Sequence, residues 1–395
     1  MKRTLVLLAA AMVVMDAAPG LVFGLLPQIQ QRGGFSTAEL GLVSGSGFAA
    51  MVFGLLTLSH FADRGHSRLM VLAGLAGVAA GLFGFGFATS LPAMVLSRVV
   101  LGLAAAVYTA AARAFAATID PASAGRNLGI LTSAEIIGFI SGPVLGTTLK
   151  QLGNISTPFY ALGSLALAIA AIFVIRFPTI HSEAIPHPTS WTRTVGLDLL
   201  SNKRIRAATL MGLAVYLPIG VFDSVWSIYL TDLGASETFI GLSLSLYGIP
   251  LALLAGAGGK ICDRSGPVRS ASRAIWVIAP VIVLYGVFRT PWVICAFSII
   301  DAAFEAIATP GCQLAIARSC PSERMASGQG LGAVFGLAGS ALLASAAPAV
   351  YAAVGAFPLF TGLAVICLCI AMLAARLHGP DVEPVHHVFT ERPAR

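Results

Sequence analysis

The sequence predicts an all-α membrane protein in which twelve transmembrane helices form two pseudo-symmetric six-helix bundles. Three observations predict this fold: an apolar composition, twelve apolar runs of spanning length, and an internal repeat. Of the 395 residues, 57% are hydrophobic and only 10% are charged. Soluble domains carry about 25% charged residues, so this composition indicates that lipid surrounds most of the chain.

The apolar runs fall into two sets of six, each run close to the roughly 20 residues that cross a bilayer. They lie at approximately 5–27, 39–59, 69–89, 92–117, 127–149 and 158–176, and then at 206–230, 237–258, 271–288, 292–316, 327–350 and 357–376. We therefore expect an N-terminal bundle over 1–177, a cytoplasmic linker over 178–205, a C-terminal bundle over 206–377 and a solvated cytoplasmic tail over 378–395. The first run is too long for a signal peptide, so we expect it to remain as a span.

The two sets match in register at an offset of 200 residues. The segment from Ser36 to Leu42 aligns with that from Ser236 to Leu242, Asp63-Arg64 aligns with Asp263-Arg264, and Pro121 aligns with Pro321. Parallel six-helix repeats related by an axis along the membrane normal place a binding site at their interface. The repeat therefore predicts a central site between the bundles.

Basic residues indicate the orientation. With the N-terminus inside, only three of the 24 basic residues fall in predicted outer loops, namely Arg32, Lys150 and Arg289. The positive-inside rule then places both termini in the cytoplasm. The net charge of +7 is thus a topology signal and not a nucleic-acid surface. The six cysteines have neither zinc-ligand spacing nor the pattern of a disulfide framework, so we expect no metal and no cofactor.

Two segments at equivalent positions of the repeat carry a recognisable motif. The second reads Gly259-Lys-Ile-Cys-Asp263-Arg264-Ser-Gly266-Pro-Val-Arg269, and the first runs from Ser59 to Arg68. Both resemble the G-x-L-A-D-R-x-G-R-[RK] cytoplasmic loop of the major facilitator superfamily, although the first departs from it at Ser59, His66 and Ser67. The resemblance implies gating loops that contain Asp63, Arg64, Asp263 and Arg264. The alternative is a pair of ordinary basic loops.

Two further elements resemble the drug:proton antiporter branch of that superfamily. Arg98-Val-Val-Leu-Gly102 resembles its R-x-x-x-G element, and Gly129 followed by Gly138, Gly142, Pro143 and Gly146 is similar to its antiporter signature, departing at Thr147. The resemblance implies an exporter that exchanges its substrate for protons. The spacing of the three glycines after Gly129 also predicts a small-residue packing face, and Pro143 predicts a bend.

Six ionisable residues lie well inside the apolar runs, where each costs about 2.5–3.5 kcal/mol on insertion scales. We therefore expect them to face protein or water and to serve proton coupling or substrate binding: Asp16, Arg98, Glu135, Asp223, Asp301 and Glu305. Asp301 and Glu305 are one helical turn apart, and two close carboxylates do not easily both ionise, so one should hold a proton. The alternatives are a structural pair with Arg98, a hydrogen-bonded neutral acid, or a local cap at Asp16.

In the family, the first, fourth, seventh and tenth helices line the central cavity, and they carry all of these residues except Glu135. Aromatic residues accompany the acids: Phe23, Tyr216, Trp226 and Phe304. Acids with aromatic rings suit lipophilic neutral or cationic molecules. The spans contain almost no Asn or Gln for sugars, and Arg98 is the one cation available for anions.

Together these features predict a proton-coupled exporter of lipophilic small molecules that works by alternating access. It would be a monomer in the plasma (inner) membrane, with no enzymatic activity and no nucleic-acid partner. The alternatives are an importer or exporter of a native metabolite, such as a lipid or sugar derivative, and a membrane sensor that does not transport. We also expect a short basic helix from Trp191 to Arg206 on the inner membrane surface.

Overall fold

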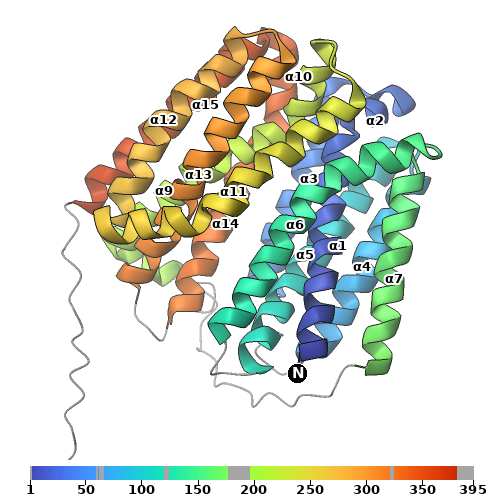
Figure 1. Ribbon diagram of the computed structural model, residues 1–395, viewed down its shortest axis with the longest axis horizontal. Helices are drawn as coiled ribbons and strands as arrows, with labels where there is room; N and C mark the ends of the chain where they lie inside the picture. Colours follow the sequence, from blue (N-terminus) through green and yellow to red (C-terminus); the bar gives the residue numbers. More distant parts are fainter. Residues whose placement is uncertain are drawn as a thin grey trace, which may run out of the picture.

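The computed structural model describes residues 2–58, 61, 66–119, 124–176, 196–320 and 324–379, and this part of the chain is helical (Figure 1). Twelve of its helices are long and apolar enough to cross a membrane. The expected all-α architecture with twelve membrane helices is therefore confirmed.

The first set of spans is α1 (Lys2–Gly24), α3 (Thr37–Thr57), α4 (Ser67–Phe87), α5 (Leu91–Ile119), α6 (Ala124–Gln151) and α7 (Thr157–Arg176). The short helix α2 (Leu26–Gly33) follows α1. The second set begins with a span in three parts, α9 (Lys203–Val221), the π-helical turn η4 (Phe222–Trp226) and α10 (Ser227–Asp232). It continues with α11 (Glu237–Ser265), α12 (Pro267–Val287), α13 (Pro291–Ser319), α14 (Met325–Val354) and α15 (Ala356–His378).

The repeat is visible in how corresponding helices begin. The Ser36 hydroxyl accepts a hydrogen bond from the Glu39 backbone N–H at 3.3 Å, and the Glu39 carboxylate accepts one from the Ser36 N–H at 2.7 Å. This capping box starts α3. In α11 the Ser236 hydroxyl accepts from the Phe239 N–H at 3.2 Å. The two aligned serines are therefore both helix N-caps.

The same helices pair within both sets. In the first set α1 packs on α6, α3 on α5, and α4 on α5 and α7, and in the second α9 packs on α14, α11 on α13, and α12 on α13 and α15. Between the sets, α3 packs on α14 and α6 packs on α11. In the repeat α3 corresponds to α11, and α6 corresponds to α14, so each of these two contacts is the counterpart of the other. The two bundles are therefore related by pseudo-symmetry (Figure 1).

The bundles are joined near one end of the molecule, which we call the α2/α10 end. Lys150 at the end of α6 pairs with Glu237 at the start of α11, with Nζ and Oε2 2.6 Å apart. The Ser227 hydroxyl of α10 donates to the carbonyl of Phe23 in α1 at 2.6 Å. The N-terminal end of α1 lies at the opposite end (Figure 1).

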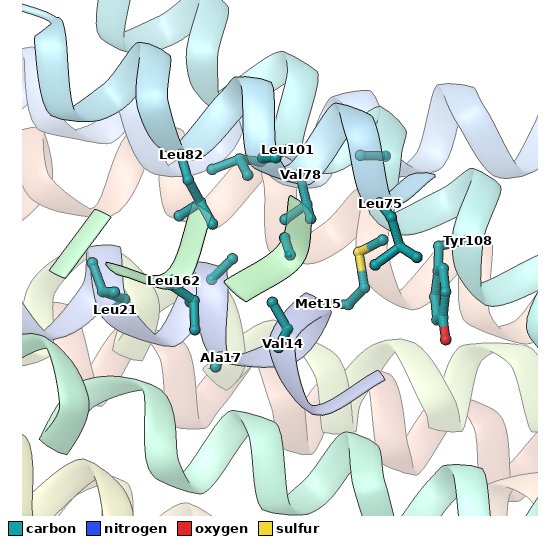
Figure 2. Close-up of a cluster of buried hydrophobic side chains, with 14 of the residues drawn as sticks. Val14, Met15, Ala17, Leu21, Leu75, Val78, Leu82, Leu101, Tyr108 and Leu162 are labelled. Carbon is teal, nitrogen blue, oxygen red and sulfur yellow. The ribbon is translucent and has the colours of Figure 1, made fainter. Parts of the chain in front are cut away.

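Each bundle has its own apolar core. Figure 2 shows part of the first, in which side chains of α1, α4, α5 and α7 interdigitate. Tyr108 is fully buried there, and its hydroxyl donates to the carbonyl of Leu8 at 2.6 Å. The hydrogen bond satisfies the one polar atom that this ring brings into the core. The second core is formed by α9, η4, α10 and α11 to α15.

The structure corrects one expected loop. α11 continues to Ser265, so Asp263 and Arg264 lie in its last turn and not in a loop. The chain turns at Gly266, where φ is 86°, and Pro267 occupies the first turn of α12. A helix interior tolerates Gly259 at a cost of about 1 kcal/mol. The helix ends instead at Gly266, whose positive φ is readily adopted only by glycine. Asp63 and Arg64, in the first copy of the motif, lie outside the described residues.

The basic helix expected from Trp191 to Arg206 is not continuous over its described part. Gly196 has φ of 81° and precedes a 3₁₀ turn, η3 (Leu197–Ser201). Asn202 is extended, and its side chain accepts from the Arg204 N–H at 2.9 Å, which caps α9. Two helix-interrupting conformations, at Gly196 and Asn202, therefore break this segment before α9 begins at Lys203. The rest of the linker, 178–195, and residues 380–395 of the tail lie outside the described residues.

Candidate functional site

A buried ion pair joins the two bundles. The Arg98 guanidinium of α5 lies 3.5 Å from the Asp223 carboxylate of η4, and the side chains are 4% and 0% exposed. The guanidinium also lies over the ring of Phe23, 5.1 Å from its centre. A structural pair with Arg98 was one alternative that the sequence offered for the buried acids, and the structure shows this pair for Asp223. The two charges compensate each other, which makes both tolerable inside the membrane.

A second charged cluster lies in the first bundle, on α1, α5 and α6. Arg113 pairs with Glu135 at 2.7 Å, and their side chains are 48% and 35% exposed. Asp16 is within electrostatic range of both. Its Oδ2 is buried without a hydrogen-bond partner among the described residues. The cluster therefore has two acids and one base.

Arg113 is a site residue that the sequence did not reveal. It lies near the end of an apolar run, where a basic residue reads as a topology signal. In the structure its guanidinium turns to α6 and meets Glu135. Arg113 and Glu135 are 22 residues apart and on different helices. Nothing in the sequence therefore distinguished Arg113 from the other basic residues.

The two acids of α13 are each bound by a tyrosine from another helix. The Tyr285 hydroxyl of α12 donates to Asp301 at 2.8 Å, and the Tyr247 hydroxyl of α11 donates to Glu305. Both acids are buried. The acids thus lie one turn apart as expected, but each has its own phenol. A buried tyrosine hydroxyl in an apolar span must find a partner, and this general rule was the one signal that could have indicated these pairs.

The π-helical turn η4 carries two of the predicted site residues, Asp223 and Trp226. Pro218, four residues before it, has no backbone N–H to donate, which disturbs the α-helical ladder. The turn carries Phe222, Asp223 and Trp226, and the Trp226 indole donates to the Ser243 hydroxyl of α11 at 3.1 Å. Single π turns of this kind occur often at functional sites.

An aromatic pocket lies between the bundles, beside the Arg98–Asp223 pair. Its cavity volume is about 50 Å³, and it is lined by Phe23 and Phe139 of the first bundle and by Ile219, Phe222, Asp223, Trp226, Ser243, Leu244, Tyr247 and Ser298 of the second. Small-molecule sites typically have mostly apolar walls with a few polar groups, as this pocket does. This pocket therefore suits an apolar molecule.

A second pocket lies within the C-terminal bundle, and we call it the acid pocket. Its cavity volume is about 10 Å³, and it is lined by Asp301, Glu305, Tyr247, Ala214, Val215, Pro218, Ile275, Ile278 and Cys367. Of the predicted aromatic residues, Phe23 and Trp226 line the aromatic pocket, whereas Tyr216 and Phe304 line neither pocket. Tyr216 instead packs against Gly336 of α14.

The glycine element of α6 forms the contact with α1. A Cβ at Gly142 would lie 2.6 Å from the carbonyl oxygen of Ala17, and one at Gly138 would lie 3.0 Å from the Cβ of Asp16. Gly146 faces Leu21, and Pro143 packs against two glycines of α1. The predicted small-residue face therefore exists, and it sets the separation between α1 and α6.

In the described part of the chain, no group of three or more His, Cys, Asp or Glu residues is arranged to hold a metal ion. The six cysteines, all within the described residues, are unpaired.

The family model described as Major Facilitator Superfamily matches residues 7–222 and 208–394. The chain belongs to the major facilitator superfamily. The expected family is thereby confirmed, together with its fold of two six-helix bundles. The chain is a multi-pass membrane transporter of this superfamily.

Individual relatives agree with this assignment. The chain is 22% identical over 318 residues to the uncharacterized MFS-type transporter MJ1560 of Methanocaldococcus jannaschii, covering 79% of this chain and 82% of the relative. It is 23% identical over 325 residues to the multidrug resistance protein MdtG of Citrobacter koseri, covering 79% of both chains. The crystal structure of a variant of the nucleoside transporter NupG superposes with a TM-score of 0.78 at 16% identity, covering 95% of this chain and all of that one, and so shares the fold.

Proposed function

We propose that this transporter is a proton-coupled exporter of lipophilic neutral or cationic small molecules, working by alternating access. The observation that carries the proposal is the pairing of two buried, phenol-bound acids with an adjacent aromatic pocket between the bundles. The relatives named as multidrug resistance proteins are consistent with such substrates.

The chemistry of the aromatic pocket supports the substrate class. Its walls are rings and aliphatic chains, and its polar groups are two serine hydroxyls, the Tyr247 hydroxyl and the Asp223 carboxylate. Arg98 already compensates that carboxylate. A sugar would leave most of its hydroxyls without partners there, at a cost of about 1–3 kcal/mol for each unsatisfied group. A flat apolar molecule incurs no such cost.

The acid pocket supports the coupling to protons. Asp301 and Glu305 are buried in a span, and no Lys or Arg is among the residues that line this pocket. Ionised carboxylates without a compensating cation are costly inside a membrane, so a proton is the natural counter-charge. A carrier that binds protons on one side and releases them on the other requires such acids.

The arrangement of the bundles supports an inward-facing state. They are joined at the α2/α10 end, and the basic residues concentrate toward the opposite end. Under the positive-inside rule this opposite end faces the cytoplasm of the plasma (inner) membrane, with both termini inside. The partly exposed Arg113–Glu135 pair then lies in reach of water from the cytoplasmic side.

The test is transport in inverted membrane vesicles with and without an imposed proton gradient, at matched expression. The probes are tetraphenylphosphonium, a lipophilic cation, and N-phenyl-1-naphthylamine, a neutral aromatic amine. We expect Glu305→Gln and Asp301→Asn to abolish gradient-driven transport while the protein remains folded and inserted. Asp16→Asn should weaken transport of the cation and spare the neutral probe.

Glu135→Gln is the matched control, because it also neutralises an acid within a span but leaves the acid pocket intact. Full gradient-driven transport by both α13 variants, together with its loss in Glu135→Gln, would assign the coupling to α6. Absence of gradient-driven transport of either probe by the wild-type protein would contradict the proposed function itself.

A further inference from the structure

Tyr247 of α11 lines both the aromatic pocket and the acid pocket. Its hydroxyl donates to Glu305, and its ring lies edge-on to Phe222 with centroids 6.0 Å apart. The side chain is half-buried. One face of this residue can therefore contact a molecule in the aromatic pocket while its hydroxyl contacts the acid.

Tyr247 also lies where the two bundles meet. Its neighbour Gly248 packs directly against Ile140 of α6, and the Ser245 hydroxyl donates to the Ile140 carbonyl at 2.5 Å. A movement of one bundle against the other must change this part of α11. The ring position of Tyr247 is therefore sensitive to both pocket occupancy and conformational state.

We propose that Tyr247 is a positioning residue that links occupancy of the aromatic pocket to the ionisation of Glu305, an inference that rests on the proposed function. A substrate packed against the ring holds the hydroxyl on the carboxylate. A hydrogen bond donated to a carboxylate stabilises its ionised form, so substrate binding favours release of the proton. By reciprocity, a protonated Glu305 weakens substrate binding by the same factor. This linkage enforces exchange even for a substrate without charge.

Other titratable groups surround Glu305, and each has a different position. Asp301 is on the same helix, Tyr216 and Cys367 approach from α9 and α15, and Tyr285 binds Asp301 from α12. None of these side chains lines the aromatic pocket. Among the phenols near the acids, Tyr247 therefore has the position that a link between the two pockets requires.

Tyr285 offers a matched control. It also donates its hydroxyl to a buried acid of α13, but it is fully buried and lines neither pocket. Rings of Phe222, Trp226 and Phe360 surround it. Its position is therefore fixed by packing whether or not a substrate is bound.

The experiment measures the affinity of purified protein for N-phenyl-1-naphthylamine between pH 5.5 and 8.5. A neutral probe is used because a cation would also compete with protons by direct charge repulsion. For the wild type we expect affinity to fall by about fivefold or more on acidification, the lower range of allosteric coupling. In Tyr247→Phe the ratio between the two pH extremes should drop below about twofold, while Tyr285→Phe should keep the wild-type ratio.

A double-mutant cycle separates a link from a general structural effect. Glu305→Gln should also remove the pH dependence, and adding Tyr247→Phe to it should change the ratio no further. A wild-type ratio in Tyr247→Phe overturns the inference and leaves the proposed function standing. A pH-independent wild type that still shows gradient-driven transport also overturns the inference alone. A wild type that neither binds nor transports the probe overturns the proposed substrate class and the inference with it.

Discussion

Replacing Gly142 by alanine is expected to destabilise the protein, whereas the same change at Gly146 is expected to be nearly neutral. A Cβ at position 142 would lie 2.6 Å from the Ala17 carbonyl oxygen and 3.0 Å from the Gly20 Cα. Both atoms belong to the backbone of α1 and cannot rotate away. At position 146 the nearest atoms are the carbonyl oxygen and Cγ of Leu21, at 3.2 and 3.4 Å.

The magnitudes follow from two opposing effects. Alanine favours a helix over glycine by about 1 kcal/mol, and overpacking a close interface costs about 1–3 kcal/mol. At Gly142 the upper part of that range applies, which leaves a net loss of about 2 kcal/mol. At Gly146 a cost of about 1 kcal/mol cancels the gain. At Gly362 of α15 nothing lies within 4 Å of a new Cβ, so the gain remains.

The assay is the free energy of unfolding in mixed detergent and dodecyl sulfate micelles, with Gly362→Ala as the matched control. The expected order of stability is Gly362→Ala, then wild type and Gly146→Ala together, then Gly142→Ala. Equal stability of the variants at 142 and 146 would refute the packing argument. A Gly142→Ala protein that is fully stable but inactive would instead assign the glycine element a role in transport beyond packing.

Three further changes test the contacts that join helices. Arg98→Met or Asp223→Leu alone should cost about 3–5 kcal/mol by leaving one buried charge unpaired, and the double variant should recover most of it; unfolding titrations of all three would show this. Replacing both Lys150 and Glu237 by Gln should alter the free energy of unfolding by less than about 1 kcal/mol. The same double change should open the α2/α10 end, and an increase in the distance between spin labels on the two bundles at that end would show this. Asp263→Asn removes the 3.0 Å pair with Arg318 that links α11 to α13, so turnover should fall more than substrate affinity; wild-type transport kinetics would exclude a gating role.

The sequence was sufficient for the fold because length and polarity decide which segments cross a membrane. The twelve apolar runs and the repeat with Ser36 and Ser236 both correspond to helices in the structure. The π-helical turn at Phe222 was not predictable, since it changes the hydrogen-bond ladder without changing the apolar pattern. The end of α11 was misplaced because Gly259 and Gly266 look alike in sequence, and only the second has a positive φ.

The site was only partly predictable for a related reason. Charges inside apolar runs are conspicuous, so Asp223, Asp301 and Glu305 could be named from the sequence. Their partners depend on the register between helices, which the sequence does not contain. The phenols of Tyr247 and Tyr285 come from two other helices, and no spacing along the chain relates them to α13.

Apart from Asp16, whose Oδ2 has no hydrogen-bond partner among the described residues, the charged residues singled out inside the spans divide into two kinds. The division bears on how the proposed exporter would carry both neutral and cationic molecules. Arg98 with Asp223, and Arg113 with Glu135, are compensated within the protein. Asp301 and Glu305 have phenols but no base among the residues lining their pocket, so a proton or a cationic substrate must supply the opposite charge. A lipophilic cation can therefore displace the proton through charge alone. A neutral substrate cannot, and the proposed link through the hydrogen bond between Tyr247 and Glu305 would give it a mechanical route from the aromatic pocket to the acid.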